Sequence, residues 1–309
     1  MPLRLVFMGS PEFAVPTLRV LLDAHEVAAV VCQPDKPAGR GQKLVAPPTK
    51  ELALHRGVPV LQPPRARDPA FLEELRRLAP DVAVVVAYGK ILPQAVLDAP
   101  RLGCLNVHAS LLPRYRGAAP IQWAIIRGET ETGVTIMQLD AGMDTGPMLL
   151  TQKVAIAEDD TAGTLSGKLS AIGAELMLLT LVRLQAGALA ATPQDHSLAT
   201  MAPMLGVDAG VVDWNLPARD VRNLVRGVDP WPVARTVLRG EPLKLWGARL
   251  AAGAGAPGEV LAADREGLVV ACGDGAIAIA ELQLPGRKRL PVPAFVAGKP
   301  IAVGSRLGA

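Results

Sequence analysis

Two polar residues stand in a segment that otherwise has the composition of a buried strand. Within GCLNVHASLLPRYRGAAPIQWA, residues 103 to 124, Asn106 and His108 are two positions apart. Side chains at i and i+2 of a strand point to the same face, so the carboxamide and the imidazole should stand side by side. They are either a satisfied pair of buried polar groups or part of a reactive site, and the pair alone does not decide between these.

A third candidate follows a second strand-like run. TGVTIMQL leads into DAGMDTGP, an acidic turn in which Gly142 and Gly146 flank Asp144. If the two strands are neighbours, this turn brings Asp144 towards His108. Each of Asp140 and Asp144 also has a simpler interpretation, since aspartate in a turn commonly caps its own backbone.

Together the three side chains suit the transfer of an acyl group. An imidazole with a pKa of about 6.5 moves protons at neutral pH, and a carboxamide N–H can stabilise the oxyanion of a tetrahedral intermediate. Asp144 can orient the imidazole and favour its cation. His108 has no adjoining Ser or Cys, and Ser110 is expected to close a turn. Direct transfer to an incoming nucleophile is therefore favoured over a covalent acyl-enzyme.

The elements that must position these groups alternate between apolar runs and helix-like segments. The runs include LRLVFMG, EVAAVVC, DVAVVVAYG and GCLNVHA. Continuous Val, Ala and Leu runs between helices indicate a parallel sheet covered on both faces. The first part is thus predicted to be a doubly wound, mostly parallel, Rossmann-like α/β domain, in which ligands bind beyond the carboxyl ends of the strands.

The opening turn argues against one ligand of such sheets. Gly9 suits the tight turn, Ser10 is predicted to cap the following helix, and Pro11 to occupy its first position. G-x-G-x-x-G is missing, so a dinucleotide site is disfavoured.

The chain of 309 residues is predicted to hold two domains. Residues 1–190 form the catalytic domain, 191–207 an aperiodic linker, and 208–309 a smaller C-terminal domain of short strands, with an OB-like β-barrel expected. Of the net charge of +3, all the excess lies in the last third, which from residue 207 holds 13 basic and 10 acidic side chains. This bias permits an anionic partner.

Composition excludes several classes of protein. Half of the residues are apolar, as in an ordinary soluble enzyme, and the apolar runs fall short of the roughly 18 residues that cross a bilayer. No targeting segment is recognisable at MPLRLVFMGS, so a cytoplasmic protein is predicted. We also expect a monomer. Cys32, Cys104 and Cys272 are far apart in sequence, which fits reduced thiols and no metal site.

The chain resembles the formyltransferases that use 10-formyltetrahydrofolate in two consecutive motifs, LNVHASLLPRYRGAAPIQWAI and TGVTIMQLDAGMDTGP. The catalytic Asn, His and Asp of that family match Asn106, His108 and Asp144. Within that superfamily, the chain is similar over nearly its whole length to the methionyl-tRNA formyltransferases. The segments that carry this likeness are MGSPEFAVPTL, QPDKPAGRGQKL, VVDWN and DPWP. The resemblance implies an enzyme that moves the formyl group to the α-amino group of methionine on initiator methionyl-tRNA, giving formylmethionyl-tRNA for translation initiation.

The resemblance also implies the binding residues. Folate would lie against Ser110, Leu111, Leu112 and Pro113, with Tyr88, Gly89, Ile91 and Leu92 beside the pterin. The initiator tRNA would meet Lys36, Arg40 and Lys43 in a Pro/Gly-rich loop, Arg40 being expected to matter most. Without the resemblance these segments read as a turn, a strand end and a solvated loop.

Further cations could contact phosphate. Arg287, Lys288 and Arg289 cluster in GRKRL, and Arg114 and Arg116 follow SLLP. Ordinary surface charge explains Arg114 and Arg116 equally well. The basic excess of the last third favours a tRNA backbone contact at Arg287, Lys288 and Arg289 over a solvated turn. Family members often carry lysine where Met204 stands, so a tRNA contact at that position is left open.

Three other functions are compatible with parts of the sequence. A formyltransferase for a small amine, such as glycinamide ribonucleotide or an amino sugar nucleotide, would use the same three residues but leave the basic loop without a role. A hydrolase of formylfolate is a variant of this alternative. An RNA-binding protein with a degenerate site is disfavoured by the intact Asn, His and Asp.

Overall fold

The computed structural model describes residues 2–38 and 41–308. The chain folds into two compact units, each assembled from separate stretches. Unit 1 comprises Met1–Pro120, Glu131–Ala155 and Ser166–Pro203, and unit 2 comprises Ile121–Thr130, Ile156–Leu165 and Met204–Ala309. The predicted limits of the linker, residues 191 and 207, stay a prediction.

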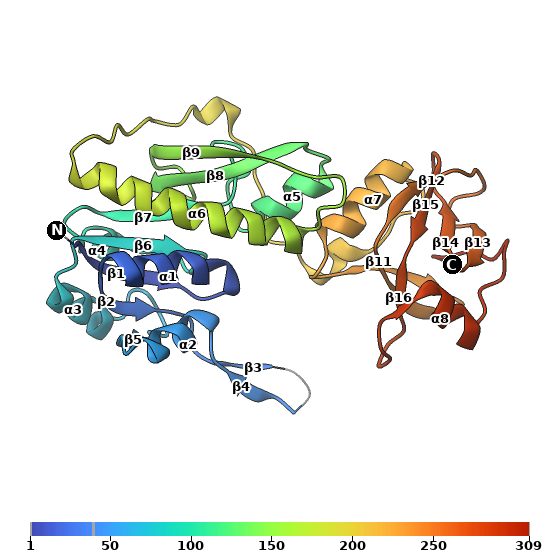
Figure 1. Cartoon of the computed structure of the whole chain (residues 1–309), viewed down its shortest axis with the longest axis horizontal. Coiled ribbons are helices and arrows are strands. Elements are labelled where there is room, and N and C mark those ends of the chain that lie inside the picture. Colours follow the sequence, from blue (N-terminus) through green and yellow to red (C-terminus); the bar gives the residue numbers. More distant parts are fainter. Residues whose placement is uncertain (1, 39–40, 309) are drawn as a thin grey trace. The chain divides into compact units, whose positions relative to one another are not determined.

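A seven-stranded sheet in the order β5-β2-β1-β6-β7-β8-β9 forms the centre of unit 1 (Figure 1). The strands are β1 (Arg4–Gly9), β2 (Glu26–Val31), β5 (Val60–Leu61), β6 (Val82–Val86), β7 (Cys104–His108), β8 (Glu131–Gln138) and β9 (Met148–Ala155). The five strands from β5 to β7 pair in parallel, and β8 and β9 are antiparallel. The predicted mostly parallel α/β sheet is confirmed.

Helices surround this sheet. They are α1 (Val15–Ala24), α2 (Pro48–His55), α3 (Pro69–Leu78), α4 (Gln94–Leu97) and α6 (Ala162–Gln185), with the 3₁₀ helices η1 (Glu12–Ala14) and η2 (His196–Leu198). In α3, Asp68 accepts from the N–H of Ala70 as N-cap, and Phe71, Leu75 and Leu78 are buried. That spacing forms one helical face, which packs on the sheet with Val6 and other strand residues.

The long helix α6 is apolar enough, with a mean hydropathy of 1.5, to cross a membrane by length and composition. Half of its most apolar stretch is buried within the protein. Gly173 brings the helix against β7, since a Cβ there would lie 2.7 Å from Val107 Cγ1, and the Ser170 hydroxyl donates to the carbonyl of Phe13. The contacts are those of a core helix.

The turn after β1 differs from its prediction. A short 3₁₀ helix, η1, precedes α1, and the Ser10 hydroxyl accepts from the backbone N–H of Gln33 at 2.9 Å. The predicted N-cap is therefore wrong, because Ser10 satisfies the backbone that leaves β2 instead of a helix start. Gly9 is required sterically, as a Cβ there would come within 2.6 Å of the Val86 carbonyl oxygen.

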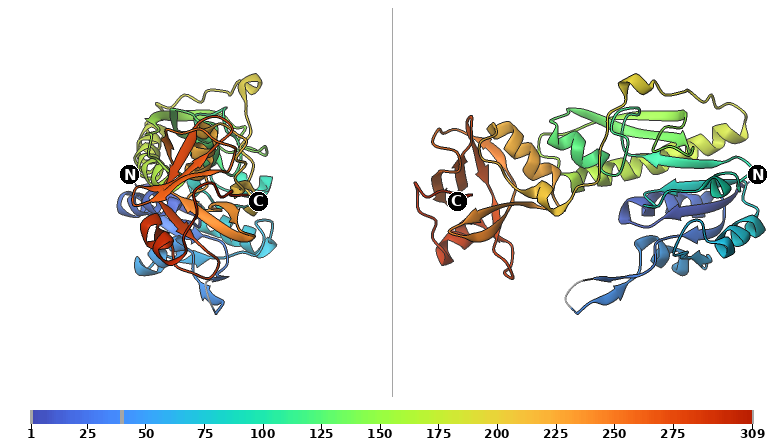
Figure 2. Two further views of the ribbon diagram at one scale, coloured as in Figure 1. Left: turned by 90° about the vertical axis from the view of Figure 1, so that its right-hand side faces the viewer. Right: turned by 180° about the vertical axis from the view of Figure 1, so that it is seen from behind.

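The basic segment after β2 forms a two-stranded antiparallel ribbon, β3 (Lys36–Ala38) and β4 (Lys43–Val45), which extends from unit 1 (Figure 2). An ion pair anchors its root. Lys50 Nζ lies 2.8 Å from both carboxylate oxygens of Asp35 and 2.9 Å from Gln62 Oε1.

Unit 2 contains two four-stranded sheets, with all pairs antiparallel. One holds β10 (Ala234–Leu238), β11 (Glu241–Trp246), β16 (Glu281–Gln283) and β17 (Leu290–Pro291), and the other β12 (Arg249–Ala251), β15 (Ala276–Ile279), β14 (Gly267–Ala271) and β13 (Val260–Asp264). With them are α7 (Ala218–Gly227), α8 (Val292–Gly298), the 3₁₀ helix η3 (Val207–Gly210) and most of α5 (Pro120–Ile126). The predicted smaller domain of short strands is confirmed.

Candidate active site

Strand β7 carries the predicted polar pair. It lies between β6 and β8, with Asn106 opposite Val85 and Met137, and all five of its residues are buried. Asn106 and His108 share one face of the strand because they are two residues apart. The structure therefore fixes both side chains at the carboxyl end of a buried strand.

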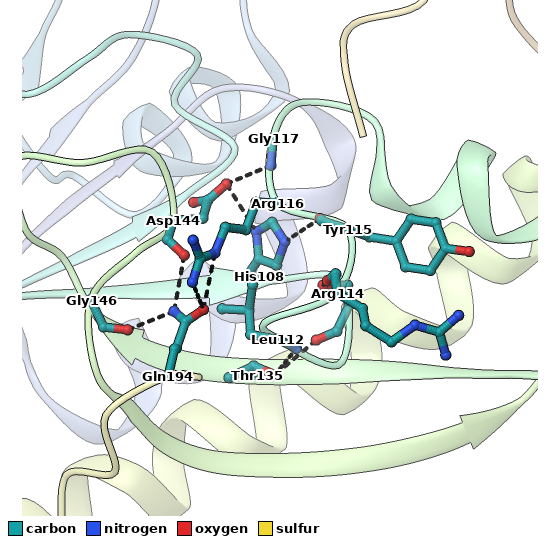
Figure 3. A network of polar contacts seen from close by, with 11 residues as sticks. His108, Leu112, Arg114, Tyr115, Arg116, Gly117, Thr135, Asp144, Gly146 and Gln194 are labelled. Atoms are coloured by element: carbon teal, nitrogen blue, oxygen red, sulfur yellow. Dashed lines mark hydrogen bonds and ion pairs between the residues drawn. The ribbon is translucent and has the colours of Figure 1, made fainter. Parts of the chain in front are cut away.

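The hydrogen bond of His108 determines which ring nitrogen is basic. Nε2 lies 2.9 Å from the carbonyl oxygen of Tyr115 (Figure 3). A carbonyl only accepts, so Nε2 carries the hydrogen and the neutral ring has its lone pair on Nδ1. Nδ1 lies 3.7 Å from Oδ2 of Asp144. The basic nitrogen thus faces a carboxylate.

The two aspartates of the acidic turn have different surroundings. Asp140 closes the turn, accepting from the N–H of Gly142 at 3.0 Å and from the hydroxyl of Thr145 at 2.7 Å. Asp144 has a left-handed backbone with φ 53°, and its Oδ2 accepts from the N–H of Gly117 at 2.8 Å. The turn-capping interpretation fits Asp140, whereas the Asp144 carboxylate points to His108.

One short loop contacts both His108 and Asp144. The carbonyl of Tyr115 contacts His108, and the N–H of Gly117 contacts Asp144. Gly117 has φ 115°, and a Cβ there would lie 2.8 Å from the Ala202 carbonyl oxygen. A glycine is therefore required where the loop passes the 192–202 segment.

Arg116, between these two residues, is only 6% exposed. Its Nε and Nη2 donate to Gln194 Oε1 at 3.1 and 2.7 Å, and Nη2 lies 3.0 Å from His196 Nδ1. The 192–202 segment thus encloses the Arg116 guanidinium, which is neither ordinary surface charge nor open to phosphate in this structure. Gln194 was not a predicted site residue, since it lies in a stretch without periodicity.

The predicted folate segment Ser110–Pro113 directly follows β7. The Ser110 hydroxyl is buried and donates to the carbonyl of Arg114 at 2.6 Å, which closes a turn. Thr135 of β8 fixes the turn, since its hydroxyl donates to the carbonyl of Ser110 at 2.8 Å and accepts from the N–H of Leu112 at 3.3 Å. Leu111 and Pro113 are half-buried.

The other predicted folate residues follow β6, the strand next to β7. Tyr88 and Leu92 pack in the core, and burial raises the pKa of the Tyr88 phenol to about 12. The carbonyl of Tyr88 accepts from Gln33 Nε2 at 2.9 Å, Gly89 has φ 75°, and Ile91 is 83% exposed. A ligand here would meet backbone and Ile91 rather than the tyrosine ring.

The predicted tRNA contacts belong to both units. Lys36 and Lys43 are exposed on the β3–β4 ribbon, and Arg40 lies outside the described residues. Arg287 and Lys288 are exposed in the turn before β17. Arg289 is already engaged, because it pairs with Glu281 and its guanidinium lies 4.6 Å from the centre of the Trp246 ring.

Three remaining observations concern Met204, metal sites and the cysteines. Met204 is exposed. Within residues 2–38 and 41–308, no three His, Cys, Asp or Glu side chains come together as a metal site. All three cysteines are buried free thiols, and burial raises the pKa of Cys104 to about 12.

Comparison with known proteins identifies the family. Residues 3–181 match the formyl transferase family model and residues 205–300 match the formyl transferase C-terminal domain. The chain is 55% identical over 307 residues to a methionyl-tRNA formyltransferase of Geobacter sulfurreducens, covering 99% of this chain and 97% of that protein. It is 50% identical over 310 residues to that of Acetivibrio thermocellus, covering 99% of this chain and all of the relative.

Solved structures share the fold. An N-formyltransferase from Helicobacter canadensis, in complex with folinic acid and dTDP-3-aminofucose, has a TM-score of 0.68 at 19% identity, covering 90% of this chain and 98% of that one. HypX from Aquifex aeolicus, in complex with tetrahydrofolic acid, has a TM-score of 0.67 at 20% identity, covering 96% of this chain and 47% of that one. This chain belongs to the formyl transferase family, and within it to the methionyl-tRNA formyltransferases.

Proposed function

We propose that this chain transfers the formyl group of 10-formyltetrahydrofolate to the α-amino group of methionine on initiator methionyl-tRNA. The observation that carries the proposal is the approach of His108 Nδ1 to the Asp144 carboxylate. Asn106 lies on the same face of β7 as His108. The near full-length relatives are named methionyl-tRNA formyltransferases, which supports methionyl-tRNA as the amine substrate.

In this proposal the neutral α-amino nitrogen attacks the formyl carbon. A new C–N bond forms, and the carbonyl oxygen takes a negative charge in a tetrahedral intermediate. The Asn106 Nδ2 donates a hydrogen bond to that oxygen, an interaction worth roughly 3 kcal/mol in sites where such a donor has been removed. The intermediate then collapses by breaking the bond between the formyl carbon and N10 of the folate.

His108 and Asp144 move the proton that this exchange requires. Nδ1 takes the proton that the attacking amine loses, and it returns a proton to N10 of the departing tetrahydrofolate. Asp144 stabilises the imidazolium between the two steps, while the Tyr115 carbonyl holds the ring by its other nitrogen. The site ends the cycle in its starting protonation state.

The proposal assigns the co-substrate to the carboxyl ends of β6 and β7. We assign its folate moiety to the turn Ser110–Pro113 and to the segment Tyr88–Leu92, which follow adjacent strands. Folinic acid and tetrahydrofolic acid in the two solved structures named above support a folate ligand. The RNA is assigned to the basic ribbon, through Lys36 and Lys43, and to the exposed turn that holds Arg287 and Lys288.

The direct test supplies the purified protein with 10-formyltetrahydrofolate and one amine at a time: methionyl initiator tRNA, glycinamide ribonucleotide or an amino sugar nucleotide. Formylmethionyl-tRNA, detected after mild hydrolysis as formylmethionine, is the expected product, and His108→Ala should form almost none. Formylation of a small amine alone would contradict the assignment and favour the small-amine alternative.

A further inference from the structure

We propose that Gln194 is a positioning residue that holds the Asp144 turn in its reactive geometry, an inference that rests on the proposed role of Asp144. Gln194 lies 50 residues beyond Asp144 in the chain, in the irregular stretch after α6. Its side chain reaches back to the acidic turn from outside the elements that carry Asn106, His108 and Asp144.

The Gln194 carboxamide is buried and makes four hydrogen bonds. Nε2 donates to the carbonyls of Asp144 at 2.9 Å and Gly146 at 2.7 Å, one on each side of Thr145. Oε1 accepts both bonds from Arg116 (Figure 3). The amide thus joins the backbone that carries the carboxylate to the loop that contacts both His108 and Asp144.

Arg116 determines which way the Gln194 amide points. A guanidinium only donates, so Oε1 must face Arg116 and Nε2 must face the two carbonyls. His196 Nδ1 lies 3.0 Å from Nη2 of the same guanidinium and helps to hold it in place. The arrangement has one orientation in which every bond is satisfied, which makes it a specific constraint on the turn.

The turn needs such a constraint because its backbone is strained and exposed. Asp144 has φ 53°, a left-handed conformation that costs free energy for a residue with a Cβ. Met143, beside it, is exposed, as are residues 140 to 142. Gly146 cannot shift towards β8, since even a Cβ there would lie 1.9 Å from the Gln138 carbonyl oxygen. Without the Gln194 bonds, we expect the turn to relax outward, which would take the carboxylate away from His108.

Gln194→Glu tests this directly. The substitution keeps the shape of the side chain and keeps an acceptor for Arg116, but it sets an oxygen against the carbonyls of Asp144 and Gly146. Displacement of a catalytic group by about 1 Å can cost about 100-fold in rate, so we expect kcat to fall about 100-fold while KM for tRNA and for folate stays unchanged. Gln152→Glu, which adds the same charge on exposed β9, is the control and should retain wild-type kcat.

Hydrogen exchange gives a readout that does not depend on activity. The amides of residues 141–146 should exchange faster in Gln194→Glu than in the wild type, and those of β7 should not. If Gln194→Glu does not fold, Gln194→Met, which removes the donors without adding charge, takes its place with the same expected changes.

The outcomes separate the two proposals. Wild-type kcat in the folded variant, or unchanged exchange of residues 141–146, overturns the role of Gln194. An equal rise in KM for both substrates, or faster exchange throughout unit 1, overturns it too, because a general structural role would then suffice. If the wild type formylates no tRNA, the proposed function fails, and the exchange measurement still decides whether Gln194 holds the turn.

Discussion

Asp144→Asn isolates the negative charge at the candidate site. Asparagine has the shape of aspartate, and its Oδ1 can still accept from the N–H of Gly117, so the turn should keep its conformation. The variant loses the carboxylate that lies 3.7 Å from Nδ1 of His108. In the proposed mechanism, the positive charge that develops on the imidazole is then no longer balanced.

The size of the effect follows from the distance and the burial. The side chain of Asp144 is 16% exposed and that of His108 6%, so an effective dielectric constant of about 20 applies, and opposite charges at this separation attract by about 4 kcal/mol. Each 1.36 kcal/mol is a factor of ten in rate. We therefore expect kcat to fall about 1,000-fold, with both KM values close to those of the wild type.

Steady-state formylation of methionyl-tRNA measures both parameters. Asp140→Asn is the matched control, because Asp140 lies in the same turn but caps its backbone, and asparagine can still accept from Gly142. It should lose less than about tenfold. Near wild-type kcat for Asp144→Asn, or an equal loss in Asp140→Asn, would refute the electrostatic role.

Two further predictions concern the β3–β4 ribbon and unit 2. Asp35→Asn removes the carboxylate that holds Lys50 at the root of the β3–β4 ribbon. KM for methionyl-tRNA should therefore rise about tenfold, as expected for loss of a charge-assisted bond, while KM for folate stays unchanged. Equal changes in the two KM values would contradict this prediction. Burial raises the pKa of the Asp229 carboxyl, so the native state loses stability as the pH rises above the unfolded pKa of about 3.9. Asp229→Asn should therefore be more stable than the wild type in urea at pH 7, with the difference shrinking towards pH 4, and a difference that does not change with pH would refute the assignment.

The sequence predicts best where local geometry is regular. Strand alternation alone places Asn106 and His108 on one face, and the apolar runs on either side of them predict the buried parallel strands. The approach of Asp144 to His108 depends on the pairing of β7 with β8, which the register establishes. The catalytic role of the three residues stays a prediction.

The parts that sequence could not predict depend on contacts between distant residues. Arg116 looks like a surface cation because its partners, Gln194 and His196, lie about 80 residues away in a stretch without periodicity. Ser10 is a residue type that commonly caps helices, but its hydroxyl accepts from the backbone N–H of Gln33 instead. The basic segment reads as a loop because Pro37 and its glycines disfavour strands, yet it pairs with itself.

A double-mutant cycle on kcat tests most directly whether His108 and Asp144 act as one unit. His108→Ala, Asp144→Asn and the double variant are measured with methionyl initiator tRNA and 10-formyltetrahydrofolate at saturation. If Asp144 acts through the imidazole, the double variant should be no slower than His108→Ala alone. Losses that multiply, so that the double variant is slower by the product of the two single effects, would contradict the proposed centre.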